Sequence, residues 1–122
     1  MSRQTKLHQV KIDKVQKFLE MAESMMGMAA GNLSHYITLY EPQDWEESPV
    51  ALLCDAYSSA RQLKELLVSK IIKPTTEEVQ ACQPGHIVFD TMELTLVNSV
   101  LVALEQYKYE LKTKYRLSFE VH

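Results

Sequence analysis

The residue types best suited to chemistry in this chain are its thiols and imidazoles, in particular Cys54, Cys82, His35 and His86. Thiolate and imidazole are the ligands that zinc prefers in a tetrahedral site. Cys82 and His86 are separated by a segment that contains a Pro-Gly pair, which is able to turn the chain and bring the two side chains together. The same two residues could instead form a nucleophile and its base. A thiol- or metal-dependent enzyme is therefore our third hypothesis.

The sequence lacks the motifs that would make this chemistry specific. It contains no His-Glu-x-x-His, no Cys-x-x-Cys and no Gly-x-Ser-x-Gly. No glycine stands before a Lys-Ser or Lys-Thr pair, as a phosphate-binding loop requires. A catalytic cysteine also needs a histidine that a third group orients, and no such group is implied. We therefore expect no catalytic residue, no metal and no cofactor, and we predict that the protein is not an enzyme.

Charge is distributed in blocks along the chain, although the formal net charge is only −3. Residues 1–19 are predominantly basic, whereas Glu20–Ala60 contains no lysine or arginine. Lys11, Lys14 and Lys17 could contact phosphate, so a nucleic-acid-binding regulator is our alternative hypothesis. Nucleic-acid-binding domains usually present a broader positive surface, and we therefore favour a protein partner over nucleic acid. The charge blocks could also pair with one another inside a bundle or guide the formation of a dimer.

A methionine stripe is the strongest candidate for an interaction surface. Met21, Met25 and Met28 share one side of the helix that we predict over residues 5–30. This side is displaced from the arc expected to face the core, which consists of Ile12, Val15, Leu19, Ala22 and Met26. Methionine fills gaps in cores, and it is also frequent on adaptable binding surfaces because its side chain is unbranched and soft.

We therefore predict a protein–protein interaction module, such as an adaptor, an inhibitor, an assembly factor or a small subunit of a complex. Met21, Met25 and Met28 would bind the partner, and Trp45 would supply a second contact from an exposed acidic loop over residues 41–48. Replacing Met25 and Met28 by glutamate should then abolish binding and leave the fold intact.

The elements that would position these residues are helices with recognisable first turns. Ser48-Pro49 combines an N-cap serine with a proline at the first helical position, which predicts a helix over 49–72. Thr75 with Glu78, and Asp90 with Glu93, have the spacing of capping boxes. They predict a short helix over 76–82 and a long helix over 90–117.

Other segments are less regular. Gly31-Asn32 is a natural stop for the first helix, and the Gly27-x-x-x-Gly31 spacing could alternatively be a notch that another backbone approaches. Residues 33–45 fit one face of a helix and also the alternation of a strand, and we favour a short helix. Residues 86–89 and 118–121 are suited to short extended segments, which could pair with each other.

The long helix over 90–117 is the spine of the predicted fold. It carries no charge between Glu93 and Glu105, on any side. Such a helix is typically covered by other elements or by a second copy of itself, so a homodimer is an additional expectation.

Residues 1–122 are predicted to form one all-α domain, an antiparallel bundle of about four helices. The chain begins without the apolar segment of a secretory signal, and its longest uncharged run, Ser24–Tyr40, is too short and too polar for a membrane span. Two cysteines are too few for a disulfide scaffold and are interpreted as free thiols. We therefore expect a cytoplasmic protein with no membrane contact.

Overall fold

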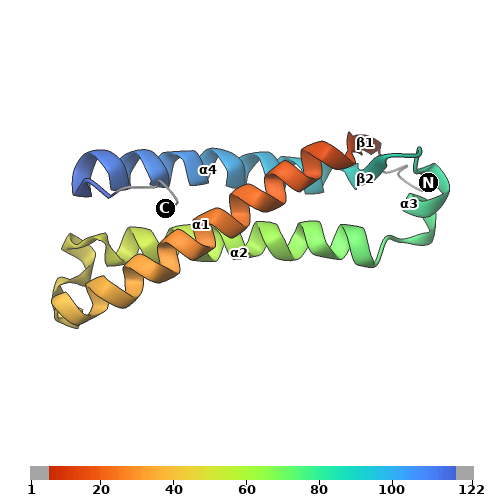
Figure 1. Cartoon of the computed structure of the whole chain (residues 1–122). Coiled ribbons are helices and arrows are strands. Elements are labelled where there is room, and N and C mark those ends of the chain that lie inside the picture. The colour runs from red at the N-terminus through yellow and green to blue at the C-terminus, as the bar shows by residue number, and fades with distance from the viewer. Residues whose placement is uncertain (1–5, 118–122) are drawn as a thin grey trace, which may run out of the picture.

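The computed structural model describes residues 6–117 and is predominantly helical, which confirms the predicted all-α fold, and it also contains one small two-stranded sheet (Figure 1). The predicted extended segment at 118–121 lies outside the described residues. In chain order the elements are β1 (Leu7–Lys11), α1 (Ile12–Leu39), the short 3-10 helix η1 (Pro42–Glu47), α2 (Pro49–Ile72), α3 (Thr76–Ala81), β2 (His86–Asp90) and α4 (Thr91–Tyr115).

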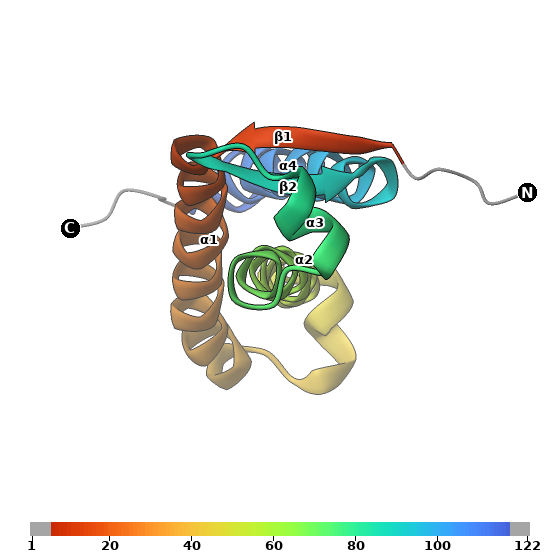
Figure 2. The same ribbon diagram turned by 90° about the vertical axis from the view of Figure 1, so that its right-hand side faces the viewer.

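The three long helices form an antiparallel bundle with α2 as its central member (Figure 1). α1 and α4 both pack against α2, and each of them runs in the direction opposite to it (Figures 1 and 2). Alanine occupies several fully buried positions of α1 and α2, which lets these two helices approach closely. The main core cluster comprises Val15, Ala22, Met25, Ala56, Ala60, Leu63, Leu67, Phe89, Val97, Val100 and Leu104.

The predicted helix starts are confirmed at all three positions, because each depends only on neighbouring residues. The Ser48 hydroxyl accepts a hydrogen bond from the backbone N–H of Val50, at 3.2 Å. The capping boxes of α3 and α4 are both complete: Glu78 and Glu93 accept from the backbone N–H groups of Thr75 and Asp90. The boundaries of α2 agree with the predicted 49–72.

The predicted boundaries of the first helix, residues 5–30, are wrong at both ends. α1 begins only at Ile12, because residues 7–11 are the strand β1. It also continues beyond Gly31 to Leu39, since Leu33 and Tyr36 pack against the second core cluster around Leu53. This burial outweighs the cost of a helical glycine, about 1 kcal/mol. Within residues 33–45, the favoured helix is therefore correct as far as Leu39, and η1 replaces much of the expected acidic loop.

The small sheet joins two segments that are far apart in the sequence. β2 is extended as predicted, and it pairs antiparallel with β1, with Leu7 opposite Asp90 and Lys11 opposite His86. The backbone N–H of Ile12 donates to the carbonyl of Gly85, at 3.0 Å, which ties the start of α1 to the turn before β2. The sheet and α3 together cover one end of the bundle (Figure 2).

Candidate functional site

The bundle opens into a groove between residues 17–32 of α1 and residues 104–108 of α4. α1 crosses near the start of α4 and then diverges from it, ending beside the start of α2 (Figure 1). The space left between the two helices is a groove of about 870 Å³. Its walls come from about four turns of α1 and from about one turn of α4. The lining residues used below are Met21, Met25, Met28, Gly27, Gly31 and Leu104.

The methionine stripe lies in this groove, but its three members differ in exposure. Met21 is 40% exposed and Met28 is half-buried, so both are accessible from the groove. Met25 is only 7% exposed and belongs to the main core cluster, together with Leu104 on the opposite wall. The prediction that Met25 is a surface contact separate from the core is therefore wrong. The buried side of α1 is therefore rotated relative to the predicted core arc: it includes Met25, whereas Ile12 of the predicted arc is partly exposed.

Two glycines leave an open notch in the α1 wall of the groove. A Cβ added at Gly27 or at Gly31 would meet no atom of the described residues within 4 Å, apart from immediate neighbours and the local helix backbone. Both glycines line the groove. Neither is therefore required by close packing within the described part of the chain, although each weakens α1 as a helix. The notch exposes helix backbone next to the accessible methionines Met21 and Met28.

Charged side chains of both signs border the apolar part of the groove. Lys17, Glu20 and Glu23 contribute from α1, and Glu105 and Lys108 contribute from α4. An apolar strip between charged borders is the usual character of a groove that binds an amphipathic helix.

Trp45 lies outside the groove. It belongs to η1, in the connection between α1 and α2, and its indole N–H donates to the carbonyl of Tyr40, at 3.0 Å. Its ring is partly buried. The structure therefore does not bring Trp45 together with the methionine stripe, and the α4 residues that line the groove beside the stripe are Leu104, Glu105 and Lys108.

The predicted basic helical arc is not formed as a continuous feature. Lys11 is the last residue of β1, and Lys14 and Lys17 lie on the first turns of α1. All three side chains are exposed, and the ammonium of Lys14 lies 5.7 Å from the centre of the Phe18 ring. The strand β1 therefore separates the basic residues into two elements.

The thiols and imidazoles do not assemble into a reactive group among the described residues. Both cysteines are free and exposed. The Cys82 thiol donates to the backbone carbonyl of His86, at 2.9 Å, while the ring Nδ1 of His86 lies 2.9 Å from the carbonyl of Pro84. The thiol is thus directed at the backbone and not at the imidazole. Within residues 6–117, no group of three or more His, Cys, Asp or Glu side chains is arranged to hold a metal ion.

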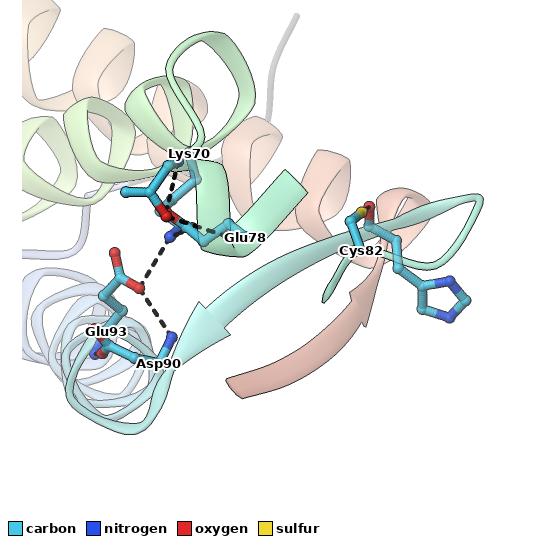
Figure 3. A network of polar contacts seen from close by, with 7 residues as sticks. Lys70, Glu78, Cys82, Asp90 and Glu93 are labelled. Carbon is cyan, nitrogen blue, oxygen red and sulfur yellow. Dashed lines mark hydrogen bonds and ion pairs between the residues drawn. The ribbon is translucent and has the colours of Figure 1, made fainter. Parts of the chain in front are cut away.

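A buried ion network, which the sequence analysis did not anticipate, closes the end of the bundle opposite η1. Lys70, from the last turns of α2, is 7% exposed and forms ion pairs with Glu78 and Glu93 (Figure 3). The Lys70 ammonium lies 3.0 Å from Glu93 Oε1 and 5.6 Å from the centre of the Phe89 ring. The two glutamates are the capping-box residues of α3 and α4, so each cap also binds Lys70 of α2.

None of the helices in the described range combines the length and the apolarity needed to cross a membrane. We compared the chain with protein-family models, with curated proteins and with solved structures, and no match was found in any of the three comparisons.

Proposed function

We propose that this protein is a protein–protein interaction module whose groove between α1 and α4 binds an apolar face of a helix from a partner protein. The observation that carries the proposal is the composition of the α1 wall. Accessible methionines and two glycines with open space above them occupy the same turns. A methionine surface adapts to different side chains, and a glycine notch admits close approach of another backbone.

The position of the groove supports a helical ligand in particular. α1, α2 and α4 provide three members of a bundle, and the divergence of α1 from α4 leaves room beside them for a fourth helix. The partner helix would contact Met21 and Met28 with its apolar face and place its polar edges against the charged borders. Binding would bury Met21, which is among the more exposed large apolar side chains of α1.

The test is affinity capture from a native lysate, with partners identified by mass spectrometry and with nuclease-treated and untreated arms. The critical variant is the double substitution Met21→Glu with Met28→Glu. This variant leaves Met25 unchanged, because a charged side chain at its buried position would destabilise the core. The matched control is Val79→Glu, which places the same charge on an exposed apolar position of α3, outside the groove.

We expect a protein that the wild type and Val79→Glu recover equally and that the double methionine variant loses, with nuclease making no difference. Circular dichroism should show the same helix content in all three proteins. Equal recovery by the double variant would overturn the groove as the binding site. Recovery that disappears with nuclease and with Lys11→Glu, Lys14→Glu and Lys17→Glu would move the function to nucleic acid.

A further inference from the structure

The outer face of α4 is exposed and carries no charge over most of the length of the helix. Along the centre of this face the side chains are polar but uncharged, or apolar. Its three most exposed apolar side chains are Met92, Val102 and Tyr109, which are 82%, 71% and 64% exposed. The remaining members of the face are Thr91, Thr95, Asn98, Ser99, Gln106 and Thr113, all exposed. Charge appears at the two borders of its second half, as the exposed Glu105 and as Glu110, which accepts a hydrogen bond from Gln106 at 3.3 Å.

This face differs from the exposed side of α2, which carries Arg61 and Glu65 as an ion pair at 3.0 Å. A solvent-facing helix surface normally holds such charges, whereas charged residues are depleted at the centres of protein interfaces. The outer face of α4 therefore has the composition of an interface.

The charges at the two ends of α4 indicate what covers this face. The helix starts at the acidic N-cap Asp90 and ends with Lys112, Lys114 and Arg116. An antiparallel copy of α4 would place the acidic start of each helix beside the basic end of the other. A parallel copy would bring like charges together at both ends, and it would also align the two helix dipoles unfavourably.

We infer that the protein forms a homodimer through this face, with the two α4 helices antiparallel about a two-fold axis between Ser99 and Val102. Residues equidistant from the axis then meet, so Met92 of one copy lies opposite Tyr109 of the second copy. Thr95 likewise lies opposite Gln106. The small side chain of Ser99 lies where the helices cross and permits close approach. The contact is isologous, so it closes on itself as a dimer.

The dimer face and the groove occupy different sides of α4. Leu104, which faces the groove, is buried, whereas Val102 points to solvent. A dimer would therefore present two separate grooves, and either inference can fail without the other.

The first measurement is the native mass of the full chain, by light scattering coupled to size exclusion and by sedimentation over a range of concentrations. We expect a dimer for the wild type and for the control Val79→Glu. Val102→Glu should raise the dissociation constant by more than about tenfold, because it places two like charges beside the two-fold axis. Tyr109→Lys is a second variant at an exposed position, and circular dichroism establishes that both variants are folded.

Disulfide crosslinking tests the orientation of the helices. In a background with Cys54→Ser and Cys82→Ser, Ser99→Cys should form a covalent dimer on oxidation, because the two copies of this residue lie near the axis. Thr113→Cys should not, because an antiparallel pair places its two copies at opposite ends. Crosslinking at both positions would overturn the antiparallel arrangement. A wild-type monomer up to about 1 mM, or a dimer insensitive to Val102→Glu, would overturn the interface, as would capture of a different protein on this face by a monomeric chain.

Discussion

The closed end of the bundle and the groove between α1 and α4 use side chains in opposite ways. At the closed end, Lys70 is held by Glu78 and Glu93 under the cover of α3 and β2 (Figure 3). In the groove, Met21 is 40% exposed, Met28 is half-buried against both core clusters, and Gly27 leaves space that the described residues do not fill. Buried charges with specific partners permit one arrangement of the side chains, whereas methionine side chains and glycine backbone can adapt to several bound side chains.

This contrast indicates how the molecule divides stability from binding. The closed end joins the N-termini of two helices to the C-terminal turns of a third, so it fixes the order of the elements. The groove lies where α1 diverges from α4 (Figure 1), and the side chains Met21 and Met28 are accessible from it, whereas Met25 and Leu104 belong to the main core cluster. We therefore expect substitutions at the closed end to change mainly stability and substitutions of the accessible groove residues to change mainly binding.

The largest effect is expected from Lys70→Met, which removes the cation and leaves two carboxylates without their partner. Removing one partner of a buried ion pair leaves an uncompensated charge, so the free energy of unfolding should fall by about 3 kcal/mol. Urea denaturation followed by circular dichroism measures the change. Lys64→Met is the matched control, because Lys64 forms a largely exposed pair with Glu23, at 3.7 Å, and should change stability by less than about 0.5 kcal/mol. Equal effects of the two substitutions would contradict the assigned role of Lys70.

A second comparison lies within the methionine stripe itself. Met25→Ala removes a buried side chain from the core and should lower the free energy of unfolding by about 2 kcal/mol. Met21→Ala truncates an exposed side chain and should change it by less than about 0.5 kcal/mol, while weakening capture of the partner. Thermal and urea unfolding of the two variants, alongside the capture assay, separate the two effects. A large loss of stability in Met21→Ala would place Met21 in the core.

A smaller effect than those of Lys70→Met and Met25→Ala is expected at Gly27, and it has the opposite sign. Gly27→Ala should raise the free energy of unfolding by about 0.5–1 kcal/mol, because alanine favours the helix and its Cβ has open space. The same methyl group would obstruct a partner helix, so binding should weaken while stability rises.

Gly85→Ala is the control, since Gly85 has φ +76° and alanine is strained there, which should lower stability. A Gly27→Ala variant that is more stable and binds the partner as well as the wild type would exclude the glycine notch from the interface.

Sequence reasoning found one wall of the groove and missed the other. The periodicity placed Met21, Met25 and Met28 on one side of a helix, and they do line the same groove. It could not reveal that Met25 is buried, because the exposure of a helical residue depends on where its neighbours pack. Nor could it bring Leu104 of α4 to the opposite wall, since nothing local relates these residues.

The features that could be derived from the sequence are those that depend on residues within one helical turn. The caps at Ser48, Thr75 and Asp90 form between residues that are close in the sequence, so the spacing of these residues is enough to predict the three helix starts. The tertiary structure alone decided the pairing of β1 with β2 and the passage of α1 through Gly31. It also decided the burial of Lys70 between two caps. In each of these cases, contacts between distant segments supply more free energy than the local preference opposes, and only the folded arrangement specifies which segments meet.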